Sequence, residues 1–421
     1  MLVNKSNLIS KLCYGDDMGG KLLIKNIGQL ATWNSKKKKM EIRENVEILI
    51  KGDSISQIGN PGNISGCKII DASGNLVTPG FVDAHTHPVF YNTREKEFEM
   101  RIEGKSYQEI AKAGGGILAS AKRLREAPQE KLKKLVKDRL DEFFRFGTTT
   151  IEAKSGYGLS VESEIESLEI LQEFKENHRL DIKTTFLGAH EYPEEYRDDH
   201  QAYLDLIIDK MIPKIAEREL ADYVDVFCEE GVFSYDESQK VLKAAQKHGF
   251  GIRLHSDEFK DVGGTKLARN FNAISADHLT AITDKGIQSL KKGGVIPILL
   301  PATTHFLGSD KFAPARKMLH EGLPVVLATD FNPGSSMTQS LPLVINIACL
   351  KMKMMPLEAL KAATYNAALA LEMEDKLGSL EPNKQADIII WNCPNYQSIP
   401  YLMAAQSVEK VIKKGEVVWK N

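Results

Sequence analysis

The sequence predicts an α/β protein in which a (β/α)8 TIM barrel carries a small β-sandwich-like domain formed from both ends of the chain. The 421 residues are enough for one large domain with an accessory one. The middle of the chain alternates short apolar strands with amphipathic helices, and both ends read as short strands separated by turns. These three observations favour a barrel of eight strands with the two chain ends paired beside it.

The middle segment supplies the barrel. Eight short apolar runs, each followed by a helical pattern, are expected to be its strands: 81–88, 147–153, 183–190, 223–229, 250–256, 274–280, 295–300 and 324–330. Helices are expected at 130–146, 162–175, 201–220, 236–248 and 357–372, where apolar residues recur at helical spacing. An open doubly wound sheet remains an alternative, since the number of strands does not by itself close a barrel.

The two β-rich ends are expected to form one composite domain of residues 1–78 and 379–421, which leaves residues 79–378 for the barrel. Asn-Pro-Gly and Ser-Gly turns separate the strands of the first segment, and the second contains the runs "ADIIIWN" and "VEKVIKKGEVVWKN". Chain termini usually lie close together, which favours one composite unit over two separate β-appendages.

The composition is typical of a globular protein with a hydrophobic core, and it fits the cytoplasm. A net charge of −2 gives no electrostatic case for nucleic acid. Five scattered cysteines without a C-x-x-C motif argue against both a disulfide framework and a thiolate zinc site, and fit a reducing compartment. We expect no signal peptide and no membrane span, because no run approaches about 20 apolar residues.

The segment "LVTPGFVDAHTHPVF" places His85 and His87 on one face at the end of the first barrel strand. An H-x-H pair can be mere polar surface, so the other strand ends matter. They carry His85, His87, Glu152, His190, Glu229, His255, His278, Thr303 and Asp330. Functional residues of such barrels lie at this face, so the pattern indicates a cation site of imidazoles and a carboxylate, suited to zinc or iron(II).

A divalent ion held in this way would lower the pKa of a bound water towards about 7 and supply a nucleophile near neutral pH. A base must then manage the protons, and His278 and Asp330 are placed to do so. The sequence leaves the choice between zinc and iron(II) open.

Several segments resemble known enzymes closely. "GFVDAHTHPVF", "RLHSDEF", "SADHLT" and "LATDFNPGS" are similar to the signature segments of the amidohydrolase superfamily. More narrowly, "THPVFYNTREKEF", "GGGIL", "EAKSGYGL", "FLGAHEYP" and "TDFNPGSS" resemble the imidazolonepropionase family, the cyclic-amide hydrolases of histidine breakdown. The similarity runs from about residue 20 to the end of the chain.

The resemblance implies roles for individual residues. The metal ligands would be His85, His87, His255 and Asp330. The substrate-binding residues would be Arg94, Tyr157, His190, Glu258, His278, Asn332, Gly334 and Ser335. The catalytic residues would be His278, Glu258 and Asp330.

The residues themselves fit these roles. The planar guanidinium of Arg94 suits a substrate carboxylate, although a salt bridge to Glu95, Glu97 or Glu99 is an alternative. Glu258 lies three residues past His255, where a carboxylate can reach a ring nitrogen of the substrate.

The chemistry implied is hydrolysis of the ring C–N bond of 4-imidazolone-5-propanoate to N-formimino-L-glutamate by a metal-activated water, in a protein that relatives suggest is a homodimer. One metal is expected rather than two, because the fourth strand ends in Cys228-Glu229 without a bridging lysine, and Lys154 is expected to be structural or an ion-pair partner. A nucleobase deaminase, a dihydroorotase-like enzyme and a non-enzymatic amidohydrolase-derived scaffold are the alternatives.

Overall fold

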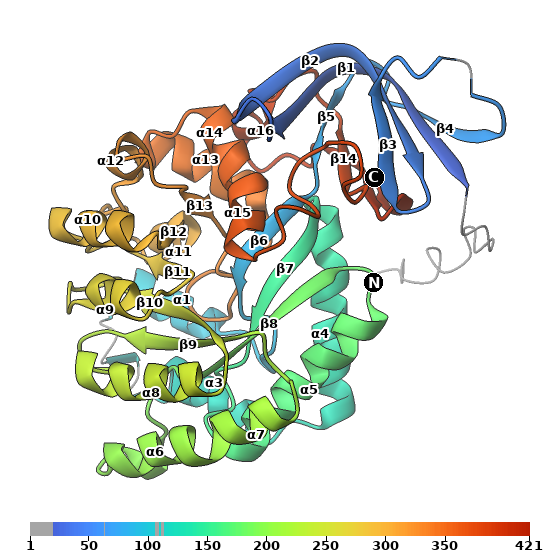
Figure 1. Ribbon diagram of the computed structural model, residues 1–421. Helices are drawn as coiled ribbons and strands as arrows, with labels where there is room; N and C mark the ends of the chain where they lie inside the picture. Colours follow the sequence, from blue (N-terminus) through green and yellow to red (C-terminus); the bar gives the residue numbers. More distant parts are fainter. Residues whose placement is uncertain (1–19, 63, 106–108, 111–112) are drawn as a thin grey trace.

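The computed structural model describes residues 20–62, 64–105, 109–110 and 113–421. Two sheets organise these residues (Figure 1). One is the predicted barrel, and the other is a mixed sheet drawn from both ends of the chain, at the top of the view. Cys13 lies outside the described residues, and the other four cysteines are free thiols.

The barrel consists of eight parallel strands that neighbour one another in chain order. Their bounds are β6 Phe81–Thr86, β7 Thr148–Lys154, β8 Asp181–Ala189, β9 Tyr223–Cys228, β10 Gly251–Ser256, β11 Ser275–His278, β12 Ile296–Leu299 and β13 Val326–Leu327. Every residue of β6, β7, β9, β11 and β12 is buried. Strands covered on both faces are rich in apolar and β-branched residues, and such short runs between helical patterns located all eight strands in the sequence.

The barrel closes through the segment that follows β13, where Thr86 and Phe331 form a parallel bridge. The backbone N–H of Asp330 donates to the carbonyl of His85 at 3.0 Å, and that of His87 donates to the carbonyl of Phe331 at 2.8 Å. The predicted barrel is therefore confirmed, and an open sheet is excluded. Strand pairing at this seam brings the end of the barrel beside the H-T-H motif.

Helices surround the barrel on its outer side (Figure 1). Their bounds are α1 Glu95–Ile102, α3 Gly116–Arg125, α4 Gln129–Arg145, α5 Val161–Asn177, α6 His200–Leu206, α7 Ile212–Glu217, α8 Tyr235–Lys247, α9 Gly264–Asn270, α10 Asp284–Gly293, α11 Pro301–Phe306, α12 Ala315–His320, α13 Leu341–Met352, α14 Pro356–Ala362, α15 Tyr365–Ala370 and α16 Ser398–Tyr401. A 3-10 turn, η2, spans Glu194–Tyr196. No helix among the described residues is long and apolar enough to span a bilayer.

Two predicted helices were wrong in detail. The helix expected at 201–220 is divided into α6 and α7 by a π-helical turn, η3, at Ile207–Met211. Pro213 follows that turn, and proline lacks the N–H that an unbroken helix would need. The helix expected at 357–372 is two helices, α14 and α15, separated at Ala363-Thr364.

The second sheet unites the two chain ends, as predicted. Its strands are β1 Lys21–Asn34, β2 Lys39–Lys51, β3 Ser54–Gly59, β4 Cys67–Asp71, β5 Leu76–Pro79, β14 Ile388–Trp391, β15 Val408–Lys413 and β16 Glu416–Lys420. They run in the order β16-β15-β14-β5-β1-β2-β3, with β4 beside β1. The pairing of β5 with β14 joins the ends, and a single residue, Gly80, separates β5 from the first barrel strand.

A buried ion cluster fastens this sheet to the barrel. The Nζ of Lys413 in β15 donates to Asp181 Oδ2 at 2.6 Å and to Asp387 Oδ2 at 2.7 Å. Asp181 begins the barrel strand β8, so the cluster crosses between the two sheets. Burial works against ionisation of Asp181, but the charge of Lys413 and hydrogen bonds from its neighbours hold the pKa of this carboxyl below its usual value.

Candidate metal centre

The first part of the site is the pair of histidines at the end of β6, together with Asp330. The Nε2 atoms of His85 and His87 lie 3.3 Å apart, and Asp330 Oδ1 lies 3.3 Å from His87 Nε2 and 3.6 Å from His85 Nε2. All three residues are buried. Ligands about 2.0–2.1 Å from a tetrahedral zinc stand roughly 3.3–3.4 Å apart, so this spacing fits a shared cation.

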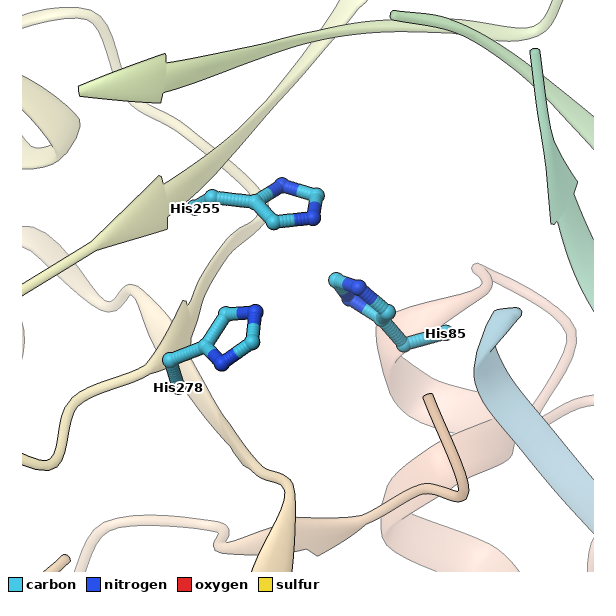
Figure 2. A group of neighbouring side chains, drawn as sticks. All are labelled: His85, His255 and His278. Atoms are coloured by element: carbon cyan, nitrogen blue, oxygen red, sulfur yellow. The ribbon is translucent and has the colours of Figure 1, made fainter. Parts of the chain in front are cut away.

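The second part of the site comes from β10 and β11. His255 and His278 form another potential metal group with His85, in which the ligand atoms lie within 4.8 Å of one another. Figure 2 shows the three imidazoles converging on one space from different sides of the barrel. The rings of His85 and His255 are 4.5 Å apart at their centroids. Among the described residues the four predicted ligands therefore fall into two overlapping groups that share His85.

Burial sets the charge state of these imidazoles. It lowers the pKa of His87 to about 3, of His278 to about 3 and of His255 to about 4, and it lowers that of His85 well below 6.5. Asp330 responds in the opposite sense, and burial raises the pKa of its carboxyl. The imidazoles are thus neutral at physiological pH, which is the form that binds a metal.

Buried carboxylates stand behind two of these histidines. The Nδ1 of His85 lies 2.6 Å from Asp277 Oδ2, and the Nδ1 of His255 lies 3.0 Å from Asp225 Oδ2. A carboxylate behind a metal-binding imidazole fixes its tautomer and orientation. Sequence reasoning missed both aspartates, although a charged residue inside an otherwise apolar barrel strand was a usable signal.

Asp330 is itself held in place, because the hydroxyl of Thr303 donates to its Oδ2 at 2.6 Å. Thr303 was among the predicted strand-end residues, and it now has a contact that explains its position. Since the other carboxylate oxygen, Oδ1, faces His85 and His87, this bond orients the aspartate towards the histidine pair.

Glu258 and His278 lie together beside the histidine cluster. The Nδ1 of His278 is 3.5 Å from Glu258 Oε1. Burial raises the pKa of Glu258 well above 4.5, and the charges of Asp330 and Glu229 add to the effect. The raised pKa favours the protonated form of this carboxyl, which can donate a proton, beside the neutral imidazole of His278.

Tyr157 and His190 line the side of the cluster next to His87. The rings of His87 and His190 stack with centroids 5.6 Å apart, and Tyr157 lies 5.4 Å from His190. The Nδ1 of His190 is 2.8 Å from the carbonyl of Gly156. A side chain on Gly156, whose φ is +110°, would come within 2.9 Å of the carbonyl of Leu187, so only glycine fits there.

The loop that carries Tyr157 is held by one buried carboxylate. Glu164 of α5 accepts backbone N–H bonds from Gly156 at 3.0 Å, Gly158 at 2.7 Å and Leu159 at 2.8 Å. Burial raises the pKa of Glu164, and these three bonds oppose the rise. Nothing in the sequence singles out Glu164, because its partners lie in a loop five to eight positions earlier.

Arg94 forms the salt bridge that was named as its alternative role. Its Nε donates to Glu97 Oε1 at 2.8 Å and one terminal nitrogen donates to Glu97 Oε2 at 2.5 Å. The guanidinium also lies under Gly334, where a Cβ would come within 2.3 Å of it. Arg94 lines a hollow of about 320 Å³ with Thr93, Glu95, Phe98, Phe306, Pro333 and Met337.

Asn332, Gly334 and Ser335 form a tight turn directly after Asp330. The Asn332 Oδ1 accepts the backbone N–H groups of Gly334 and Ser335, each at 2.8 Å, and its amide donates to the carbonyl of Asp330 at 2.7 Å. The side chain of Asn332 is therefore engaged within its own loop. Its hydrogen bonds shape the turn of residues 330–335, which lies against Arg94.

The two remaining acids at strand ends, Glu229 and Glu152, bind backbone groups or a buried lysine. Glu229 accepts the backbone N–H groups of Phe259 and Lys260, at 2.9 and 3.0 Å. Glu152 lies before the end of β7 and accepts a bond from Lys154 Nζ at 2.6 Å. Lys154 also donates to Asp225 Oδ2 at 2.8 Å, which confirms its predicted place in an ion pair.

Comparison with known sequences yields a consistent set of relatives. The amidohydrolase family model matches residues 76–418. A protein named imidazolonepropionase from Geobacillus kaustophilus is 48% identical over 90% of this chain and 91% of its own. A protein of the same name from Alkaliphilus oremlandii is 42% identical over 94% of this chain and 97% of its own.

Solved structures share the fold at much lower identity. A guanine deaminase from C. acetobutylicum superimposes with a TM-score of 0.72 at 19% identity, covering 95% of this chain and all of that one. An adenosine deaminase from Xanthomonas campestris with bound zinc superimposes with a TM-score of 0.67 at 16% identity, covering 94% and 92% of the two chains. At such identities the likeness establishes the architecture alone.

Proposed function

The chain belongs to the amidohydrolase family and, within it, to the imidazolonepropionases, and on that basis we propose that it hydrolyses 4-imidazolone-5-propanoate to N-formimino-L-glutamate in histidine degradation. The observation that carries the chemistry is the meeting of His85, His87 and Asp330 at metal-ligand spacing. The enzyme is a metal-dependent hydrolase of a cyclic amide.

One divalent ion is proposed to be held by His85, His87, His255 and Asp330. Three neutral imidazoles and one carboxylate suit zinc or iron(II), and a water molecule would be the fifth ligand. When bound, the ion would act as a Lewis acid that polarises a carbonyl and makes water acidic enough to attack near neutral pH. Burial in the barrel keeps the imidazoles neutral, and Asp277 and Asp225 orient those of His85 and His255.

Substrate binding is proposed to follow from the charge of the propanoate tail. Glu97 occupies one edge of the Arg94 guanidinium and holds it in place, so a substrate carboxylate would bind to the remaining N–H groups of its terminal nitrogens. Tyr157 and His190 would contact the ring from the side of His87. The loop that contains Asn332, Gly334 and Ser335 would close over the tail, since Gly334 already lies against Arg94.

Proton transfer is assigned to His278, Asp330 and Glu258. As the water oxygen bonds to the ring carbonyl carbon, His278, assisted by Asp330, accepts the one proton that the water releases. Glu258 orients the ring and donates a proton to the departing nitrogen, and the high pKa of its carboxyl favours this role. The ring C–N bond then breaks, leaving the new carboxylate on one side and the formimino nitrogen on the other.

The direct test supplies 4-imidazolone-5-propanoate to the purified protein. We expect loss of the imidazolone absorbance and equimolar N-formimino-L-glutamate by mass spectrometry. Guanine, adenosine and dihydroorotate serve as competing substrates in parallel reactions. If the protein converts one of these competing substrates and leaves the imidazolone unchanged, it is a deaminase or a dihydroorotase-like enzyme instead. If the metal-loaded protein converts none of the four compounds, a non-enzymatic scaffold is favoured.

Two finer points belong to the same proposal. Metal analysis of protein purified without chelator should find one ion per chain, and reconstitution with zinc or iron(II) separates the two candidates by turnover. The protein is further proposed to be a homodimer, and light scattering of the full chain measures this directly. A second ion per chain would contradict the prediction of a single metal, which was made because no bridging lysine follows the fourth strand at Cys228-Glu229.

A further inference from the structure

A fully buried ammonium group lies in the barrel interior behind the metal centre. Lys154 is the last residue of β7, and its Nζ donates to Glu152 Oε1 at 2.6 Å and to Asp225 Oδ2 at 2.8 Å. All three side chains have no exposed surface. Removing such charges from water costs several kcal/mol per ion, so the arrangement calls for a reason.

Asp225 connects this ammonium to a proposed metal ligand. Its Oδ1 accepts the backbone N–H of His255 at 3.1 Å, and its Oδ2, which binds Lys154, lies 3.0 Å from His255 Nδ1, a close approach without hydrogen-bond alignment. Asp225 lies on β9, two strands away from Lys154, and alternate strands of such a barrel fill the same interior layer. The chain of contacts therefore runs from Lys154 through Asp225 to His255.

We infer that Lys154 is a positioning residue of the metal centre, which acts by fixing Asp225 in the orientation that presents His255 to the metal. This inference rests on the proposed function, because it presupposes an ion held in part by His255. Figure 2 shows the imidazole of His255 directed towards His85 across the central space. The edge of the ring that bears Nδ1 is the one that Asp225 approaches.

The sign of the effect separates this role from direct electrostatics. An ammonium repels a divalent cation, so if Lys154 acted on the ion only through its charge, removing it would tighten metal binding. If Lys154 acts by holding Asp225, removing it weakens metal binding. Loss of a carboxylate partner behind a metal-binding histidine costs about 10- to 100-fold in affinity, and we expect a loss of that order.

The chain offers a matched control for the cost of breaking a buried ion cluster. Lys413 also donates to two carboxylates, Asp181 at 2.6 Å and Asp387 at 2.7 Å, and its side chain is 1% exposed. It lies between the two sheets and touches none of the proposed ligands. Lys413→Met should therefore lower the unfolding temperature as Lys154→Met does, without changing metal affinity.

The experiment measures zinc affinity of the full-length protein by competition with a colorimetric chelator, alongside thermal unfolding of the metal-free form. We expect Lys154→Met to bind zinc about 10- to 100-fold more weakly than wild type, and Lys413→Met to bind it equally well. Saturating zinc should restore most of the turnover of Lys154→Met. In the Asp225→Asn background, adding Lys154→Met should change the affinity no further, because both act through one contact.

If Lys154→Met does not fold, the charge-balanced variant Glu152→Gln/Lys154→Met carries the same expectation without leaving Glu152 ionised and unpaired. Wild-type or tighter zinc binding by the folded variant overturns the inference and leaves the proposed hydrolase intact. Absence of zinc binding by the wild-type protein instead overturns the metal centre itself. The two failures are therefore told apart by the wild-type measurement.

Discussion

Replacing Glu164 with glutamine tests how the loop that carries Tyr157 is held. The carboxylate of Glu164 accepts N–H bonds from Gly158 and Leu159 at one oxygen and from Gly156 at the other. A glutamine side chain has one oxygen and one NH2 group. The glutamine oxygen can still accept the N–H groups of Gly158 and Leu159. Its NH2 group then faces the N–H of Gly156, so that N–H loses its acceptor.

The size of the effect follows from that single lost bond. A buried donor without a partner costs about 1–3 kcal/mol of unfolding free energy. For a chain of 421 residues, with an unfolding entropy of about 2.1 cal/mol/K per residue, that corresponds to a fall in unfolding temperature of roughly 1 to 3.5 °C. The affected residue, Gly156, precedes Tyr157, and its carbonyl oxygen lies within hydrogen-bond distance of His190 Nδ1. If about 1.4 kcal/mol of the cost is felt when the ring binds, kcat/KM falls about tenfold.

The assay compares Glu164→Gln with Glu162→Gln, which alters an exposed glutamate on the same helix. Thermal unfolding and hydrolysis of the imidazolone are measured on both, and Glu162→Gln should match wild type in each. The reasoning fails if Glu164→Gln also retains the wild-type unfolding temperature and kcat/KM, because the three N–H bonds would then contribute nothing to the loop.

Four further outcomes are expected. His278→Ala should lower turnover by about 10²- to 10⁴-fold while keeping its metal, whereas His255→Ala should lose metal, as turnover and metal content will show. Arg94→Lys should raise KM for the propanoate substrate, since lysine lacks the planar fork, but leave that of an analogue without the carboxylate unchanged. Removal of the metal by a chelator should abolish turnover, and zinc or iron(II) should restore it. The pKa of Asp181 is lower in the folded protein than the value of about 3.9 in the unfolded chain, so its carboxylate stabilises the fold above that pH. This stability is lost as the pH falls towards the folded value. The unfolding temperature of Asp181→Asn should therefore change less between pH 5 and 3 than that of wild type.

Much of the barrel could be predicted because its strands are buried on both faces and so consist of short runs rich in apolar and β-branched residues. The helices were predicted where one face is apolar, as for α4 and α8, which match the expected ranges to within one residue. The π-helical turn between α6 and α7 could not be foreseen, because the apolar pattern continues through it and only Pro213 marks the change.

The candidate site was predictable where its residues end strands. His85, His87, His255, His278 and Asp330 were placed together by that rule alone. The residues that support them were not, since their roles depend on contacts across the barrel rather than on position in a strand. Asp225, for example, lies in the middle of β9 and meets Lys154 and His255 only when the strands close into a cylinder.

The order of the mixed sheet has a consequence for synthesis of the protein on the ribosome. The strand β5 leads directly into β6, which carries His85, yet one of the two neighbours of β5, β14, is translated roughly 300 residues later. At about 5 to 20 residues a second, the nascent chain exposes an unpaired edge of β5 for tens of seconds. The final strands thus complete the sheet only at release, and chains cut short before Ile388 leave that edge open to aggregation.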